Sequence, residues 1–184
     1  TASHYALDSH AVRKREEGRV HLDGFLSYPS AVYTVPYGVM VPKEVGNLLL
    51  PVPVSGSHIG FSTLRMEPCW MAMGQAAGIA SALSIDGKVK VQNIDLSRLQ
   101  DKLVDQKATL MYFKDVDYTS PHFRMVQYLG LRGYLPEWTA RLQEPVDMAT
   151  LTAWKKLSGK GLPGIEAGKT TRLVALEMIY RKIK

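Results

Sequence analysis

The stretch SGSHIGFSTLRMEPCWMAMGQAAGIASAL, residues 55–83, decides the fold that this sequence predicts. Its first half is rich in glycine and serine, and its second half carries almost no charge. Glu67 and Pro68 mark the change, because an acidic residue and a proline favour the first turn of a helix. We therefore expect a polar loop followed at once by a helix, which runs to about Ser84 and stops at the Asp86–Gly87 pair.

The residues before the loop complete a strand–turn–helix unit. The run NLLLPVPV, residues 47–54, is short and continuously apolar, which is typical of a strand buried on both faces. In such a unit the backbone amides of the loop and the positive end of the helix point to one place. Anions and polar cofactor edges bind readily there. The same pattern also occurs as a plain tight connection.

The remaining chain divides into a strand-rich part and a helical part. Residues 8–26 predict two strands joined by a turn at EEG, and residues 31–41 predict an edge strand or a strand interrupted at Pro36. Asp95 caps an amphipathic helix over residues 96–107, and three further helices are expected after residue 109. The sequence thus predicts an α+β fold, with one domain over residues 1–108 and a small helical unit over residues 109–184.

Composition excludes several classes of function. The chain carries a net charge of +6, but its basic residues are spread along the sequence and are not interleaved with aromatic ones, so we expect no nucleic-acid partner. Cys69 is the single cysteine, and the histidines lack metal-ligand spacing, so we expect no metal site. No apolar run approaches the roughly 20 residues of a membrane span. The compartment stays open; a signal peptide on the complete protein would predict a periplasmic or secreted location.

Residues 35–82 carry a resemblance to a known family. PYGVMVPK, NLLL, SGSHIGFSTLR and RMEPCWMAMGQAAG follow the family patterns PYR-x-LVPK, NLLV, SASH-x-A-x-GS-x-R and RMEP-x-x-M-x-LGQAAG. The chain closely resembles the C-terminal part of bacterial FAD-dependent oxidoreductases of the glutathione-reductase-like fold. The likeness covers about residues 8–107, including DSHAV near the start.

The resemblance implies roles for individual residues. The strand, loop and helix would complete the FAD domain, and the antiparallel segment before them would belong to a substrate domain. His10 and Arg13 would face the substrate. The residues expected near the flavin are Ser57, His58, Gly60, Ser62, Arg65, Met66, Glu67 and Pro68, with Gly74 and Gln75 further along the supporting helix.

The sequence also departs from the family pattern. Gly38 stands where relatives commonly have an arginine, and no G-x-G-x-x-G follows a strand. We therefore expect the N-terminal FAD-binding half of the enzyme as a partner, and weak or no FAD binding by these residues alone.

The helical part carries a second resemblance. YFKDVDYTSPHFRMVQYLGLRGYLP, residues 112–136, and TTRLVAL, residues 170–176, are similar to an S-layer homology repeat. The alternative is a helical cap on the flavoprotein.

Three side chains are the candidate catalytic residues. An imidazole titrates near neutral pH, so His58 is a candidate for acid–base work or for polarising the flavin, and a loop histidine satisfied by backbone is the alternative. Arg65 would hold an anionic substrate or stabilise negative charge on reduced flavin, unless it pairs with Glu67. His10 shares one face of its strand with Asp8, while Arg13 falls on the other.

The leading hypothesis is hydride transfer between FAD and a small organic or carbohydrate substrate. One alternative is a non-enzymatic module that binds glycans or a cell surface through the helical part. Another is a polysaccharide lyase, because some relatives are labelled xanthan lyases. A lyase needs a base and a charge-neutralising cluster in a groove, which the five scattered histidines do not provide.

Overall fold

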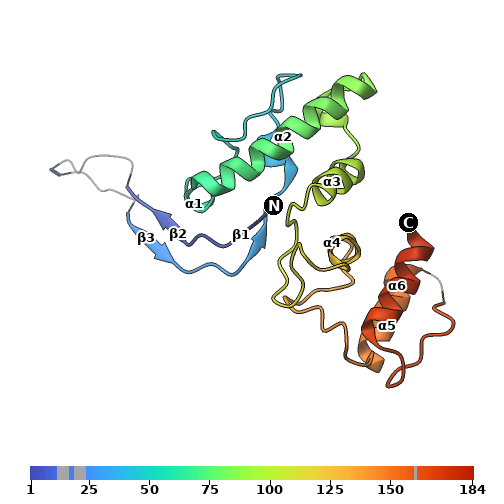
Figure 1. Ribbon diagram of the computed structural model, residues 1–184. Helices are drawn as coiled ribbons and strands as arrows, with labels where there is room; N and C mark the ends of the chain where they lie inside the picture. Colours follow the sequence, from blue (N-terminus) through green and yellow to red (C-terminus); the bar gives the residue numbers. More distant parts are fainter. Residues whose placement is uncertain (12–16, 19–23, 160) are drawn as a thin grey trace. The chain divides into compact units, whose positions relative to one another are not determined.

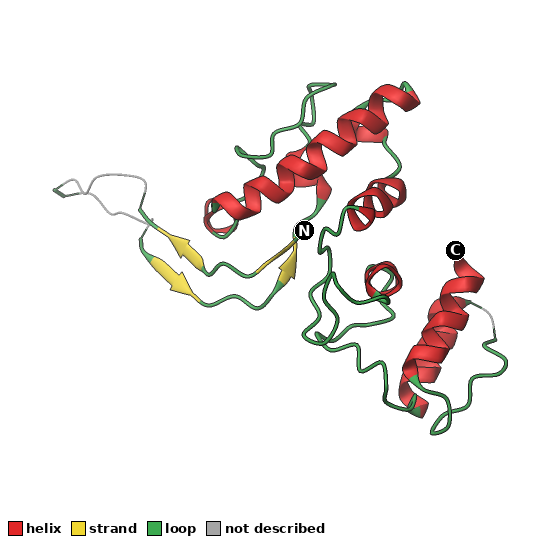
Figure 2. Cartoon of the chain, viewed as in Figure 1, coloured by secondary structure: helices red, strands yellow, loops and turns green. Residues whose placement is uncertain are grey.

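The computed structural model describes residues 1–11, 17–18, 24–159 and 161–184. They form two compact units, Thr1–Leu103 and Val104–Lys184. Short antiparallel strands and helices make up the first unit, and helices joined by turns make up the second (Figures 1 and 2). The fold is α+β, as the sequence predicts. The division into domains at residue 108 stays a prediction.

Four short strands open the first unit. β1 (Ala2–Ser3) pairs antiparallel with β4 (Tyr33–Thr34), and β2 (Leu7–Ser9) pairs antiparallel with β3 (Leu26–Tyr28). Ser3 lies opposite Tyr33 and Leu7 lies opposite Tyr28. The three residues between Ser3 and Leu7 therefore face the four residues between Tyr28 and Tyr33, so the longer segment bulges. Pro29 lies in that bulge, where its missing N–H costs no ladder hydrogen bond.

The predicted hairpin over residues 8–26 lies mostly outside the described residues. Its base is present as the β2–β3 pair, and Gly18 has a φ of 75°, which suits a tight turn. Arg13, expected on the substrate side, falls in the range 12–16 and is not described.

The strand predicted for residues 47–54 is wrong. This segment is irregular, and Leu48 and Val52 are exposed by 39% and 44%. The amide of Leu50 donates to the carbonyl of Met40, which lies in the 3₁₀ turn η1 (Tyr37–Met40). Pro51 and Pro53 cannot donate to a ladder, so this apolar run packs as an extended connection.

Two helices follow where one loop and one helix were expected. α1 (His58–Ser62) is a single short helix inside the predicted loop. α2 (Glu67–Gly87) starts at the predicted residue and ends three residues beyond Ser84, where Lys88 closes it in the left-handed conformation. A 3₁₀ turn, η2 (Val91–Asn93), leads to α3 (Leu96–Asp105), and Asp95 caps α3 by accepting from the amides of Ser97 and Arg98.

A small core holds the first unit together. Met40, Val54, Leu64, Cys69, Met73 and Ala77 are its buried members. Burial raises the pKa of the Cys69 thiol, so this thiol is protonated and inert at neutral pH. Half of this core comes from one face of α2.

The second unit contains α4 (Phe123–Gly130), α5 (Met148–Ser158) and α6 (Arg172–Ile183), in the regions where helices were predicted. Asp147 caps α5 by accepting from the amide of Thr150, and Thr171 caps α6 by accepting from Val174. Gly159 ends α5 with a φ of 61°. Local caps therefore set the helix boundaries in this unit.

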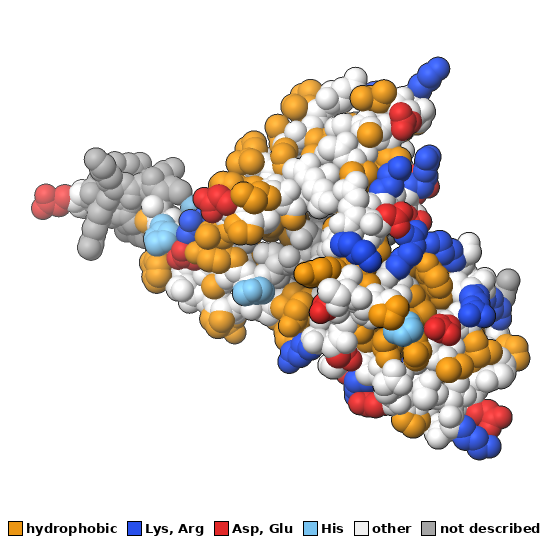
Figure 3. All heavy atoms as spheres, viewed as in Figure 1, with side chains coloured by type: hydrophobic (Ala, Val, Ile, Leu, Met, Phe, Trp, Pro, Cys, Tyr) orange, Lys and Arg blue, Asp and Glu red, His pale blue; other side chains and the backbone are white. Residues whose placement is uncertain are grey.

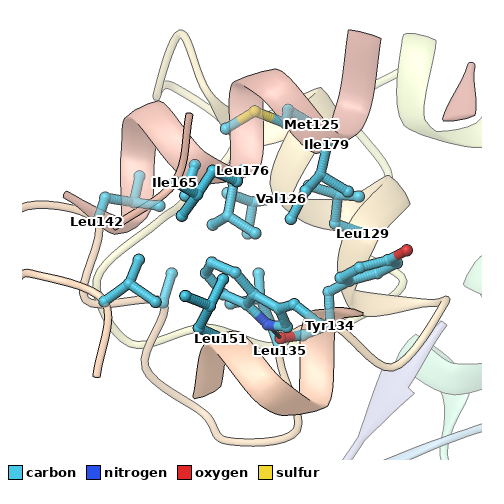
Figure 4. Packing of buried hydrophobic residues seen from close by; sticks show 14 of the residues in the cluster. Met125, Val126, Leu129, Tyr134, Leu135, Leu142, Leu151, Ile165, Leu176 and Ile179 are labelled. Carbon is cyan, nitrogen blue, oxygen red and sulfur yellow. Dashed lines mark hydrogen bonds between the residues drawn. The ribbon is translucent and has the colours of Figure 1, made fainter. Parts of the chain in front are cut away.

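The core of the second unit is continuous. Val126 and Leu129 of α4, Leu151 of α5 and Leu176 and Ile179 of α6 point into one apolar interior (Figure 4). Trp154 is 1% exposed, and its indole N–H donates to the carbonyl of Tyr134 at 2.7 Å. Across both units, no helix in the described part of the chain is long and apolar enough to cross a membrane.

Candidate functional site

Asp8 on β2 joins two of the predicted site residues. One carboxylate oxygen lies 2.5 Å from a terminal nitrogen of Arg65, and the other lies 3.1 Å from Nε2 of His10. The Tyr5 hydroxyl donates to the same carboxylate at 3.3 Å, and the Arg65 guanidinium lies 5.8 Å from the centre of the Tyr5 ring. Asp8 therefore connects the strand pair to the segment that begins α2.

His58 is fixed by its place at the start of α1. Ser57 caps this helix, and its hydroxyl accepts from the amide of Gly60 at 3.0 Å. Nε2 of His58 lies 2.9 Å from the backbone carbonyl oxygen of His10. A carbonyl can only accept, so this contact places the proton of a neutral His58 ring on Nε2 and leaves Nδ1 as the acceptor. His58 is thus held by backbone, and among the described residues its Nδ1 has no hydrogen-bond partner.

Hydrogen bonds of hydroxyl groups join the segment around β2 to the segment around α1. Ser62 is 4% exposed; its hydroxyl donates to the carbonyl of Ile59 and accepts from the amide of Asp8. The Thr63 hydroxyl donates to the carbonyl of Tyr5, and the hydroxyl of Tyr33 donates to the carbonyl of Thr63 at 2.9 Å. These bonds fix β2 against α1, so Asp8 and Arg65 meet in a defined geometry.

The N-terminal end of α2 lies directly after Arg65. Its N-cap, Met66, makes no side-chain hydrogen bond to the helix, while Glu67 and Pro68 occupy the exposed first turn. Gly74 and Gln75 lie two turns further along, about 10 Å from Glu67 by helical rise. The structure therefore brings His10, Ser62 and Arg65 into contact with Asp8 and His58 into contact with the backbone of His10. Ser57 and Gly60 contact each other at the start of α1, and Gly74 and Gln75 lie further along α2.

We name the group formed by Asp8, His10, His58 and Arg65 the Asp8 cluster. It combines a carboxylate, a guanidinium and two imidazoles on a partly exposed surface; the Asp8 and Arg65 side chains are 25% and 36% exposed. Such a group can bind an anion through Arg65 and can exchange a proton through His58 Nδ1 or His10. No set of three potential ligands in the described residues could hold a metal ion.

Sequence reasoning understated Asp8. The spacing D-x-H correctly places Asp8 and His10 on one side of a strand. For Arg65, however, the carboxylate partner considered from the sequence was Glu67. The structure pairs Arg65 with Asp8, 57 residues away. Tyr5 carries no motif, and Thr63 lies inside the SGSHIGFSTLR motif but was not singled out.

Comparison with known proteins defines the class of this chain. The family model described as FAD dependent oxidoreductase matches residues 1–103. The chain therefore belongs to the FAD dependent oxidoreductase family, and its first unit is an FAD oxidoreductase region. Searches of curated proteins and of solved structures give no match.

FAD is the cofactor that this family implies, and the described residues fit part of it. A helix start without a side-chain cap and the Arg65 guanidinium offer positive charge for the flavin end of the cofactor. The indole N–H of Trp70, in the first turns of α2, is buried and has no partner in the described part of the chain. The G-x-G-x-x-G spacing occurs only after α5, at Gly159, Gly161 and Gly164, so it does not form the strand–turn–helix that binds a dinucleotide phosphate.

Proposed function

We propose that this chain forms the C-terminal region of an FAD-dependent oxidoreductase that transfers hydride between FAD and a small organic or carbohydrate substrate. The observation that carries the proposal is the Asp8 cluster at the N-terminal end of α2. FAD supplies the hydride-accepting and hydride-donating chemistry when it is bound. The residues described here supply charge, orientation and a site for proton exchange.

Arg65 is the proposed electrostatic group. Asp8 holds its guanidinium beside the start of α2, so a fixed cation and a helix N-terminus face the same place. Fixed positive charge stabilises negative charge that develops on a ring system or on a substrate carboxylate. Ser57, Gly60, Met66, Glu67 and Pro68 would line this end of the cofactor.

His58 and His10 are the proposed proton-handling groups. A substrate that loses a hydride from carbon must also lose a proton from its hydroxyl or amino group, and a neutral imidazole can accept that proton. His58 offers Nδ1, because Nε2 is bonded to the carbonyl of His10. His10 is also exposed, with 63% of its side chain accessible, and would face the substrate side.

The outer face of α2 supports the proposal of a missing FAD-binding half. Met71 is 74% exposed, and hydrophobic side chains gather on the surface over α2 (Figure 3). No described atom lies within 4 Å of the place a Cβ would take at Gly74 or Gly78, so this face could accept a closely packed neighbour. A helix apolar on all sides is typical of a domain interior. We propose that the dinucleotide-binding half covers it, next to Gly74 and Gln75.

The proposal is tested by purifying the full natural polypeptide that includes these residues and measuring its flavin content. We expect it to purify with the visible absorbance of bound flavin and to melt at a higher temperature with added FAD. The variant Arg65→Gln should bind FAD but lower the flavin midpoint potential, whereas Arg98→Gln, on the exposed face of α3, should not. A colourless polypeptide whose melting temperature does not change when FAD is added would overturn the proposal.

A second candidate function concerns the second unit alone. Tyr118 and Trp138 are exposed by 58% and 42%, and exposed aromatic rings offer flat apolar faces for sugar rings. This unit has its own continuous core, so residues 104–184 can be tested by themselves. If these residues bind cell-wall polysaccharide and Trp138→Ala abolishes the binding, this would support a glycan-binding module of the S-layer-like kind. Lack of retention on any cell-wall fraction would contradict it.

A further inference from the structure

The far end of α2 holds a second polar site, unrelated to the Asp8 cluster. A hollow of about 540 Å³ opens there, lined by Asn47, Ser81, Ser84, Ile85, Lys88, Val89, Lys90 and Val91. This volume falls within the range of small-molecule sites, roughly 300–1,000 Å³. α2 has 21 residues, so about 30 Å of helix separates the hollow from Arg65.

The lining of this hollow is positively charged. Lys88 and Lys90 contribute two ammonium groups, and neither has a hydrogen bond, an ion pair or a ring contact within the described ranges. No acidic residue lines the hollow. Asn47, Ser81 and Ser84 add neutral polar groups, and Ile85, Val89 and Val91 add apolar surface. Two unpaired cations beside an apolar wall match an organic anion better than a neutral or cationic molecule.

The walls are held in place by hydrogen bonds to backbone carbonyls. The Ser84 hydroxyl donates to the carbonyl of Val89 at 2.5 Å, and the amide of Val89 donates to the carbonyl of Ser84 at 3.0 Å. The Tyr37 hydroxyl donates to the carbonyl of Val91, and the side-chain Nε2 of Gln92 donates to the carbonyls of Pro42 and Val45. The segment carrying both lysines is thereby fastened to α2 and to the loop that precedes Asn47, so the hollow exists before any ligand arrives.

Lys88 occupies an unusual position for its residue type. It closes α2 with a φ of 49°, in the left-handed region that glycine adopts most easily, while Gly87 beside it is helical. Asn47, which also lines the hollow, has a positive φ of 60°. Non-glycine residues in this region carry a conformational cost and are often found at binding sites. Lys88 therefore adopts a backbone conformation that glycine would adopt at lower cost.

We propose that this hollow, which we call the Lys88–Lys90 site, binds a small organic phosphate or carboxylate. The two ammonium groups take the anionic head, and Ile85 and Val89 contact the apolar body. The site is independent of the proposed flavin chemistry, because it shares no residue with the Asp8 cluster and lies at the other end of α2.

Phenyl phosphate, benzoate and inorganic phosphate are suitable probes for the purified 184-residue chain. NMR titration should give saturable shifts at Asn47 and at residues 88–91 with phenyl phosphate, and weaker binding for inorganic phosphate, which lacks the apolar body. Stronger binding of benzoate than of phenyl phosphate would identify a carboxylate site, and the reverse a phosphate site. Added NaCl should weaken both.

Two substitutions separate binding from folding. Lys88→Gly should weaken binding at least about fivefold while leaving the melting temperature unchanged or higher, because glycine relieves the left-handed position. Lys90→Gln should weaken binding by a similar factor. Lys155→Gln, on the exposed face of α5, removes the same charge and should leave binding within about twofold. Shifts that do not saturate, or equal binding by all variants, would overturn the proposal.

Discussion

The two units of this chain bury their apolar side chains to different extents. In the second unit, helices α4, α5 and α6 converge on one continuous core around Trp154, Val126 and Leu176. In the first unit, α2 buries one face against a small core, while Met71 and Ile85 on its other face are exposed. Strands of two or three residues cannot cover a helix of 21 residues. The second unit has a continuous interior of its own, whereas the described residues of the first unit leave one face of α2 uncovered.

The largest expected effect is loss of the second unit through Trp154→Ala. This change removes a large buried ring and its hydrogen bond to Tyr134, and we expect it to lower the free energy of unfolding by about 3–5 kcal/mol. Trp138 is 42% exposed, so Trp138→Ala should cost less than about 1 kcal/mol. Urea unfolding followed by circular dichroism measures both. Similar costs would mean that this core is not the main source of stability.

A buried amide gives the next largest effect. Gln127 is fully buried; its side-chain oxygen accepts from the amides of Leu110 and Met111, and its side-chain nitrogen donates to the carbonyl of Met111. Gln127→Leu leaves three backbone groups without partners, which should cost about 3 kcal/mol in total. Gln143→Leu, at an exposed position, should be nearly neutral in the same urea titration. A neutral Gln127→Leu would show that water replaces the lost bonds.

The first unit should tolerate core truncation better than the second. Met73 is 2% exposed, and Met73→Ala should lower the free energy of unfolding by about 2–3 kcal/mol, the low end of the usual range, because few residues surround it. Met71→Ala, two residues earlier on α2, should change it by less than about 0.5 kcal/mol. Calorimetry of the whole chain would report both, and a large cost for Met71→Ala would contradict an open outer face of α2.

Local signals made the helices predictable, and long-range pairing made the site hard to predict. Asp95, Asp147 and Thr171 mark helix starts that depend only on residues a few positions away, so the helical part of the fold follows from the sequence. The contact between Asp8 and Arg65 spans 57 residues and leaves no periodic trace. His58 and Arg65 were identified through the family resemblance, and Asp8 only through its D-x-H spacing.

The wrong strand at residues 47–54 has a physical explanation. An apolar run predicts burial but not the element that is buried, and a strand also needs a neighbour that accepts and donates hydrogen bonds. Pro51 and Pro53 remove two donors from this run, and no strand in the described residues lies beside it. Hydrophobicity predicted that Val54 would be buried. Whether the segment forms a strand depends on a neighbouring strand, which the sequence of the segment does not specify.

The second unit should show a pH-dependent stability in the acid range. The hydroxyl and amide of Thr150 hold the pKa of Asp147 below its ordinary value of 3.8. A lowered pKa in the folded state adds stability above the unfolded pKa, and this is lost as pH falls through the folded pKa. The melting temperature of residues 104–184 should therefore fall between pH 5 and pH 2, less steeply in Asp147→Ser, which keeps a capping oxygen without the charge. Equal pH profiles would exclude Asp147 as a contributor.

Asp8→Asn should give the smallest change in stability and the most local one. Its ion pairs with Arg65 and His10 are partly exposed, so their loss should cost less than about 1 kcal/mol. The Arg65 guanidinium should nevertheless lose its fixed position, because the Asp8 carboxylate is its only ion-pair partner among the described residues. NMR would detect this as faster exchange of the guanidinium protons. Asp86→Asn, an exposed change near the other end of α2, should leave that signal unchanged. A well-ordered Arg65 in Asp8→Asn would mean that α2 itself orients the cation, and Arg65 would then face the flavin end without support from the strands.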